Sequence, residues 1–74
     1  MTYRVMVLIA VSYERRGDDC GTRWVEAETI DGASRPNYAR TRARDASRIY
    51  FEHGYSPAPG EFYLVLATHV ESVA

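Results

Sequence analysis

The first predicted strand constrains the fold most, because it is apolar on both of its faces. Residues 2–13 read TYRVMVLIAVSY, and apolar side chains occupy both the odd and the even positions. A strand with this pattern is buried on two sides, so it lies in the middle of a sheet. The sequence therefore predicts a sheet with this segment at its centre.

Two further strands are predicted in the rest of the chain. Residues 14–21, ERRGDDCG, are typical of a hairpin loop because glycines and aspartates interrupt the apolar pattern. Residues 22–30 then alternate as a half-exposed strand. Residues 61–70, after a proline-rich linker, are again apolar at both parities and predict the third strand.

One helix is expected between the second and third strands. Apolar residues recur there at helical spacing, namely Ala39, Ala43, Ala46, Ile49 and Tyr50. Ser34 is the expected N-cap, Pro36 lies in the first turn, and Gly54 ends the helix. An alternative is a strand over 37–44 and a helix over 45–53 only. We favour the long helix, because a strand over 37–44 buries little apolar area.

The order of these elements predicts the topology. A helix that follows the second strand returns the chain so that the third strand can pair with the first in antiparallel fashion. The prediction is one small α+β domain over residues 1–74, with the order ββαβ. Its three-stranded antiparallel sheet has the strand order 2-1-3, and one helix packs on one face.

Composition narrows the class of protein. The formal net charge of −1 is unlike that of a general nucleic-acid binder, which has a basic excess. All nine basic residues are arginine, which reflects either a GC-rich genome or a need for bidentate contacts. Cys20 is the only cysteine, and the apolar run 5–11 is too short to span a bilayer. We therefore expect a soluble protein in the cytoplasm, with no membrane partner.

A single helix shields only one face of the predicted sheet. Val5, Val7, Ile9, Val11, Val25 and Ala27 are expected beneath the helix. The opposite face carries Met6, Leu8, Ala10 and Trp24, and the third strand adds either Phe62, Leu64 and Leu66 or Tyr63 and Val65. Soluble monomers seldom expose an apolar patch of this kind. We predict a homodimer or partner face that includes Met6, Leu8, Trp24, Tyr63 and Val65; the alternative is a roof of loops or the proline-rich linker.

A second candidate surface lies on the helix. Arg40, Arg44 and Arg48 recur every four residues on the side away from the alanines, with Phe51 close to the same line. Arg42 falls near the buried side and is expected either to extend its guanidinium past the apolar side to solvent or to pair with Asp45. Arg48 is expected to pair with Glu52. We predict that Arg40, Arg44, Arg48 and Phe51, together with Trp24, contact a partner. The alternative is an ordinary solvated helix face.

No catalytic signature accompanies these surfaces. The segment GDDCG over 17–21 supplies too few ligands for a metal ion, and no histidine is placed beside Cys20 by the sequence. Glu26 and Glu28 are expected on one strand face as solubilising charges. We expect neither an enzyme nor a protein that carries a metal or cofactor.

The VEAET strand end at 25–29, the alanine- and arginine-rich helix and the final apolar strand resemble the plan of very small phage-encoded proteins. These proteins include anti-CRISPR inhibitors of type I surveillance complexes. The resemblance implies a non-catalytic inhibitor in the cytoplasm of a bacterial host, which docks on a CRISPR complex or its nuclease and blocks nucleic-acid or nuclease access. Alternatives are a small nucleic-acid-binding accessory protein that uses the arginines, and a structural phage protein that forms oligomers.

Overall fold

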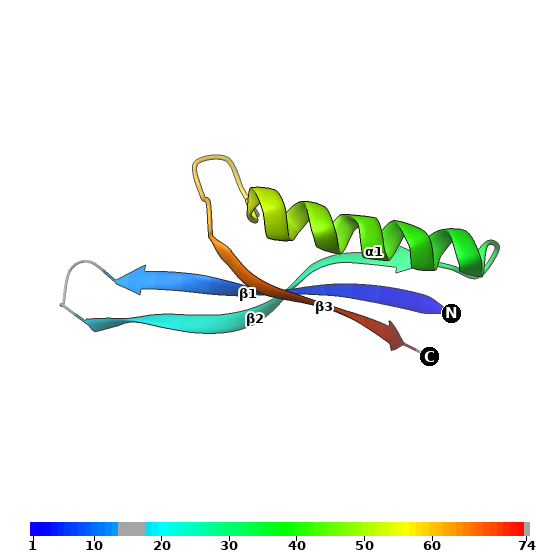
Figure 1. Cartoon of the computed structure of the whole chain (residues 1–74), viewed down its shortest axis with the longest axis horizontal. Helices are drawn as coiled ribbons and strands as arrows, with labels where there is room; N and C mark the ends of the chain where they lie inside the picture. The colour runs from blue at the N-terminus through cyan, green and yellow to red at the C-terminus, as the bar shows by residue number, and fades with distance from the viewer. Residues whose placement is uncertain (14–17, 74) are drawn as a thin grey trace.

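The computed structural model describes residues 1–13 and 18–73, with side chains over 1–11 and 21–73. Its elements are β1 (Thr2–Tyr13), β2 (Asp18–Asp31), α1 (Pro36–His53) and β3 (Val65–Val73). The strands form one antiparallel sheet in the order β2-β1-β3, and α1 lies on one face of it (Figure 1). The predicted α+β fold and sheet order are confirmed.

The bounds of α1 confirm the long helix and exclude a strand over 37–44. The predicted N-cap at Ser34 is wrong, because Arg35 is the N-cap and makes no side-chain capping bond. The Arg35 carbonyl accepts the first helical hydrogen bond, from the Ala39 N–H at 2.9 Å. Pro36 occupies the first helical position and has no backbone N–H that would need a capping acceptor. The helix can therefore begin at Pro36, one residue later than an N-cap at Ser34 would place its start. Gly54 ends the helix as predicted, with φ of 88°.

The core lies between α1 and the odd-numbered residues of β1. Val5, Val7 and Ile9 are buried, and Val11, Val25 and Ala27 pack against the same core, as the alternation predicts. Two buried alanines of α1, Ala39 and Ala43, form what we call the alanine seam, and their small side chains bring the helix close to the sheet. They pack beside Tyr3, Val5 and Ile30. Burial of these side chains is the main source of stability in a chain of this size.

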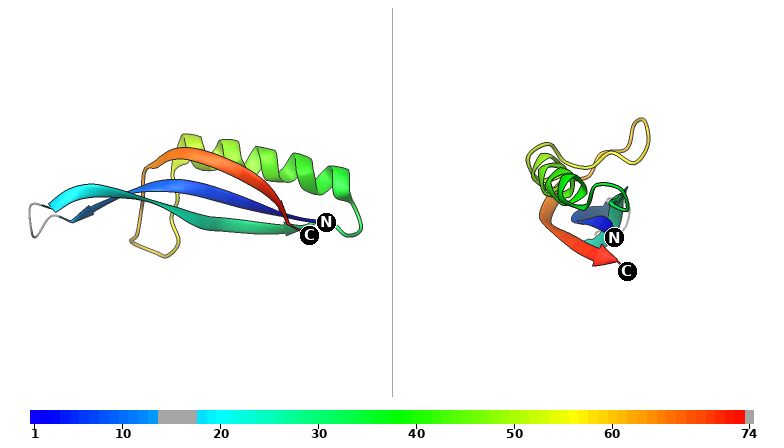
Figure 2. Two further views of the ribbon diagram at one scale, coloured as in Figure 1. Left: turned by 90° about the horizontal axis from the view of Figure 1, so that it is seen from below. Right: turned by 90° about the vertical axis from the view of Figure 1, so that its right-hand side faces the viewer.

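The segment after α1 extends the cover over the same face of the sheet. Tyr55 and Tyr63 exchange two backbone hydrogen bonds of 3.0 and 2.9 Å, and both rings pack against Val7, Ile9 and Val65. Figures 1 and 2 show this loop on the side of the sheet that α1 occupies. The alternative in which the proline-rich linker roofs the opposite face is therefore wrong. We call that opposite face the open face.

A β-bulge in β2 changes which side chains reach the open face. Val5 pairs with Glu28 while Met6 pairs with Glu26, so Ala27 is an extra residue in β2. Because side chains alternate with a period of two, one extra residue reverses the faces of everything that follows. Glu26 therefore lies on the open face, whereas Glu28 lies on the α1 side. The prediction that these two glutamates share one face is wrong.

The third strand differs from its prediction in its start and its faces. It begins at Val65 rather than Glu61, because the backbone of Tyr63 pairs with Tyr55 and is not available to β1. Val65 is only 5% exposed and packs beside Ile9, and Tyr63 is half-buried in the same cluster. The prediction that Tyr63 and Val65 lie on the open face is therefore wrong. The residues of the other predicted set, Phe62, Leu64 and Leu66, are exposed.

The second strand is also longer than predicted, since the backbone of residues 18–21 belongs to β2 and Asp18 pairs with Tyr13. The rest of the predicted hairpin loop, residues 14–17, lies outside the described residues.

Replacing Gly54 with alanine should lower the free energy of unfolding by about 1–3 kcal/mol, because the backbone there has a positive φ. A Cβ atom at this position also lies 2.5 Å from Cζ of Phe62, so the ring must move. Gly60→Ala is the matched control, since its φ is 84° but nothing lies within 4 Å of the added carbon. Urea denaturation should show the larger loss for Gly54→Ala. An equal loss in both variants contradicts the Phe62 contact.

Candidate functional site

One side of α1 faces β3. The Ser47 hydroxyl donates a 2.6 Å hydrogen bond to Oγ1 of Thr68 in β3. Residues three, four and seven positions away from Ser47 lie on the same side of the helix. This relation places Arg40, Arg44 and Phe51 on the β3 side of α1. The helix therefore presents two arginines and an aromatic ring beside the edge strand.

The three arginines of the predicted helix surface, which we call the arginine stripe (Arg40, Arg44 and Arg48), differ in their pairing. Arg48 forms the expected ion pair with Glu52, with 3.7 Å between Nη1 and Oε1. Arg40 and Arg44 are exposed, and within the described part of the chain no carboxylate lies within 4.0 Å of either guanidinium. Phe51 is exposed as predicted. Two of the three stripe arginines are thus free to contact another molecule.

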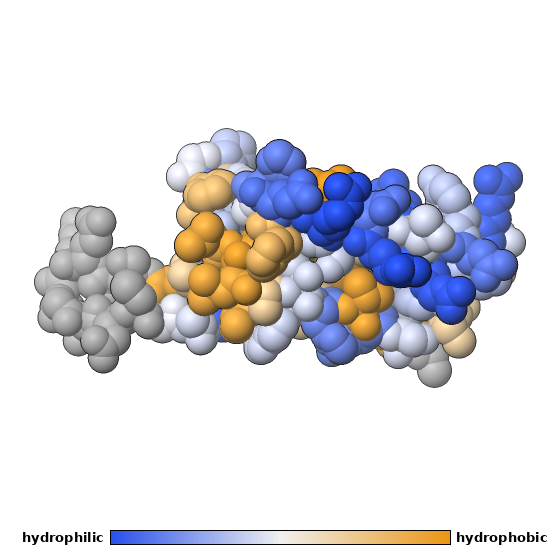
Figure 3. Space-filling model, in the orientation of Figure 1, coloured by the Kyte–Doolittle hydropathy of each residue, from blue (hydrophilic) through white to orange (hydrophobic). Residues whose placement is uncertain are grey.

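An apolar patch lies at the start of β3, near the C-terminal end of α1 that carries Phe51. Leu64 and Leu66 are 60% and 43% exposed, which is unusual for leucine in a small domain. Figure 3 shows apolar side chains gathered over the start of β3, beside a hydrophilic band that runs along α1. We call the combination of Arg40, Arg44, Phe51, Leu64 and Leu66 the β3-side surface. The sequence predicted its arginines and Phe51 but did not place them beside the leucines.

The open face is only partly apolar. Met6 and Leu8 are half-buried there, and the exposed ring of Trp24 lies on the strand position opposite Leu8. His69 meets Trp24 edge-on, with 6.4 Å between the ring centroids and an interplanar angle of 75°. The structure thus brings together Met6, Leu8 and Trp24 as predicted. The homodimer expected to use them stays a prediction.

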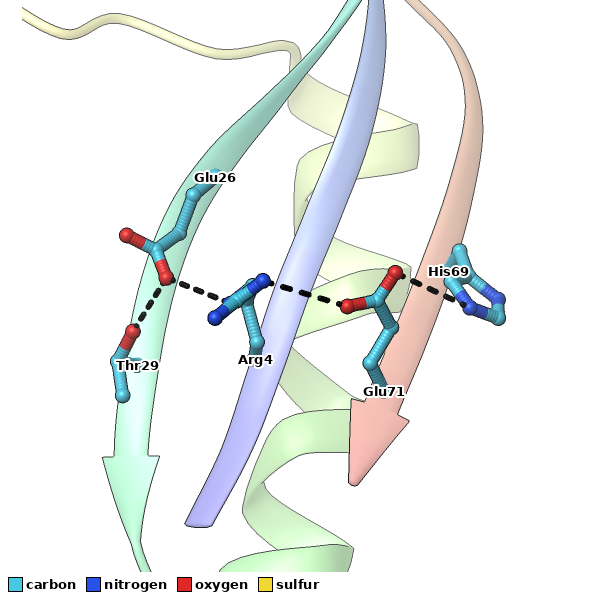
Figure 4. Close-up of polar contacts among 5 residues, drawn as sticks. All are labelled: Arg4, Glu26, Thr29, His69 and Glu71. Atoms are coloured by element: carbon cyan, nitrogen blue, oxygen red, sulfur yellow. Dashed lines mark hydrogen bonds and ion pairs between the residues drawn. The ribbon is translucent and has the colours of Figure 1, made fainter. Parts of the chain in front are cut away.

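A row of charged side chains crosses all three strands on the open face (Figure 4). Arg4 of β1 lies 3.0 Å from the Glu26 carboxylate of β2 and 3.5 Å from that of Glu71 in β3. Thr29 donates a 2.8 Å hydrogen bond to Glu26, and Nε2 of His69 lies 3.7 Å from Glu71. Exposed pairs of this kind contribute about 0–1 kcal/mol each. The row makes one end of the open face polar, which limits the apolar contact area to the region around Leu8.

A groove of about 460 Å3 opens on the other side of α1, toward β2. Helix residues line most of it and Glu28 contributes from β2; the helix residues are Tyr38, Thr41, Arg42, Asp45, Ala46, Ile49 and Tyr50. Nη2 of Arg42 lies 3.1 Å from Oε2 of Glu28, so the predicted pairing of Arg42 with Asp45 is wrong. The β2 bulge explains the difference, because it turns Glu28 toward the helix.

Tyr50 connects the groove to the core. Its hydroxyl donates a 3.0 Å hydrogen bond to Oε1 of Glu28, and its ring lies edge-on to Tyr55 with centroids 5.9 Å apart. Burial raises the pKa of Tyr50 to about 12, and both the hydrogen bond and the negative charge of Glu28 act in the same direction. The folded chain therefore holds Tyr50 in its protonated form.

The raised pKa predicts how stability depends on pH. An unfolded tyrosine loses its proton near pH 10, whereas folded Tyr50 keeps it until about pH 12. Between these values the folded state binds more protons, so stability falls as pH rises from 10 to 12. Urea denaturation should show this fall in the wild type and a shallower one in Tyr50→Phe. Identical slopes in the two proteins contradict the raised pKa of Tyr50.

Among the side chains that the structure describes, no group of three histidine, cysteine, aspartate or glutamate residues is placed to hold a metal ion. The side chains of the GDDCG segment, apart from Gly21, lie outside the described residues. Over the described parts of the chain, no helix has the length and apolar character needed to cross a membrane. Protein-family models, curated proteins and solved structures include no match to this chain.

Proposed function

We propose that the chain is a small, non-catalytic protein-binding module whose β3-side surface docks on an acidic patch of its partner. The observation that carries the proposal is that the β3 side of the molecule exposes two arginines, Arg40 and Arg44, as well as two leucines, Leu64 and Leu66. Neither arginine has a carboxylate partner among the described residues. Arginine and aromatic residues at the centre of a contact, with apolar neighbours that exclude water, are typical of protein interfaces.

The apolar part of the surface favours a protein over a nucleic acid. A nucleic acid offers phosphates to arginine and bases that can stack on Phe51, but it offers no apolar surface of the kind that Leu64 and Leu66 need to lose their water. The net charge of −1 points the same way, because long-range attraction to nucleic acid needs a basic excess. The arginines then serve orientation and rate of association, and the leucines supply affinity.

The resemblance to small phage-encoded inhibitors supplies the first partner to test. In this proposal the partner is a bacterial defence complex of the type I CRISPR class or its nuclease. Such a partner binds nucleic acid, and the proposal requires an acidic patch beside that site, where a docked module blocks access. The chain acts by occupying space, so no group in it needs to perform chemistry.

Charge reversal tests the β3-side surface. Arg40→Glu combined with Arg44→Glu should reduce capture of the partner from a bacterial lysate by about tenfold or more, because two attractive charges become repulsive. Both residues are exposed, so the folded state should lose at most about 1 kcal/mol. The matched control is Arg23→Glu with Arg35→Glu, which makes the same charge change at exposed positions elsewhere.

Two outcomes contradict this proposal. One is equal loss of capture in the two double variants, which would mean that only net charge matters. The other is loss of capture when the lysate is treated with nuclease, combined with a steep decrease of binding in salt. That combination is the signature of contacts to phosphates and would favour the nucleic-acid-binding alternative.

A further inference from the structure

The α1/β2 groove differs in charge from the exposed sides of the helix. Two carboxylates, Glu28 and Asp45, and one guanidinium, Arg42, line it, so its formal charge is −2 + 1 = −1. The rest of α1 carries Arg40, Arg44 and Arg48 and is basic. A ligand that enters the groove therefore meets negative potential within an otherwise positive helix surface.

The groove already holds one guanidinium. Arg42 binds Oε2 of Glu28 at 3.1 Å, while the Tyr50 hydroxyl occupies Oε1 at 3.0 Å. The Glu28 side chain is 26% exposed and that of Arg42 is 54% exposed, so Arg42 reaches the carboxylate from the solvent side. An external guanidinium can therefore reach the same carboxylate by the same route.

Three further features suit a cation. Asp45 has no hydrogen bond or ion pair to any described residue, so its carboxylate is free. Tyr38 is exposed at the rim and Tyr50 lies deeper, and the faces of aromatic rings attract guanidinium groups. Ile49 and Ala46 offer apolar contact to the methylene stem of a long side chain.

We propose that the α1/β2 groove binds the guanidinium group of an arginine side chain presented by a protein partner, with Asp45 and Glu28 as the anionic contacts and Tyr38 as an aromatic wall. This site is separate from the β3-side surface, which lies on the opposite side of α1. The inference stands or falls independently of the proposed function, since it requires only that an arginine side chain reach the groove.

The test is a titration of the 15N-labelled chain with N-acetyl-arginine methylamide, followed by NMR. Saturable shifts are expected at the backbone amides of Thr41, Asp45 and Ile49. N-acetyl-citrulline methylamide, which has nearly the same shape but no charge, is the matched control ligand and should bind at least about fivefold more weakly. Equal binding of the two compounds, or shifts that do not include groove residues, would overturn the proposal.

Variants distinguish a specific site in the groove from nonspecific electrostatic attraction to the chain. Asp45→Asn should weaken the affinity for the arginine compound by about fivefold, because it removes one exposed carboxylate. Arg42→Gln should increase this affinity by a similar factor, since the substitution removes the guanidinium that already occupies Glu28. Leu66→Ala, on the β3-side surface, should leave this titration unchanged. If neither Asp45→Asn nor Arg42→Gln changes the affinity, the groove is not the site.

Discussion

Val7→Asp is expected to unfold the chain. Val7 is 0% exposed and packs with Ile9 and Val65 under the loop that follows α1. A carboxylate there loses its water without gaining a partner, which costs several kcal/mol even after its pKa rises. Domains of this size have little stability to lose. Circular dichroism and NMR dispersion at pH 7 should show an unfolded chain.

The matched control for Val7→Asp is Leu66→Asp, which introduces the same carboxylate at an exposed position of the same sheet. Leu66 is 43% exposed and is not part of the buried cluster, so the variant should stay folded with a loss of about 1 kcal/mol. It should also bind the partner more weakly. A folded Val7→Asp, or an unfolded Leu66→Asp, contradicts the division between the core and the β3-side surface.

Ala43→Leu is expected to weaken the packing of α1 on the sheet. Ala43 is fully buried where α1 meets Tyr3, Val5 and Ile30, and the substitution adds three carbon atoms to a space filled by one methyl group. Overpacking of this kind costs about 1–3 kcal/mol and moves the helix away from the sheet. Urea denaturation measures the loss of stability.

Arg44→Leu controls for the helix propensity and hydrophobicity of leucine, because Arg44 is the next residue along α1 and is exposed. It should change stability by less than about 0.5 kcal/mol. If the two variants are equally stable, α1 does not pack through its alanine seam.

The sequence was sufficient to predict the order and type of the elements. Both parities of residues 2–13 are apolar, and this alone places β1 at the centre with the bounds that the structure shows. The alanine spacing and Gly54 predicted α1 in the same way. Each of these features depends on residues close together in the sequence, so the spacing of apolar residues is enough to predict it.

The faces of the strands were harder to predict, because two register shifts intervene. The extra residues Ala27 and Leu66 each reverse the alternation, and a bulge depends on how two distant strands pair. As a result Glu28 was placed with Glu26, and Val65 was placed on the open face. The row of charges formed by Arg4, Glu26 and Glu71 on the open face was not predicted, for the same reason. A single arginine in an otherwise apolar strand is nevertheless a signal that the sequence shows.

The candidate surfaces could be predicted only in part. Helix geometry predicted that Arg40, Arg44 and Phe51 are exposed, which the structure confirms. Which sheet edge they face depends on the Ser47–Thr68 contact, and that contact joins segments far apart in the sequence. The groove likewise requires the position of α1 relative to β2, which no pattern in the helix specifies.

Site-specific photo-crosslinking shows whether the β3-side surface contacts a protein. The photoreactive p-benzoyl-phenylalanine replaces Leu66 in one variant and the exposed Arg23 of β2 in the other. After irradiation in the cells that naturally produce the chain, we expect a discrete protein adduct from position 66 and none from position 23. No adduct from position 66, or the same adducts from both positions, would contradict it.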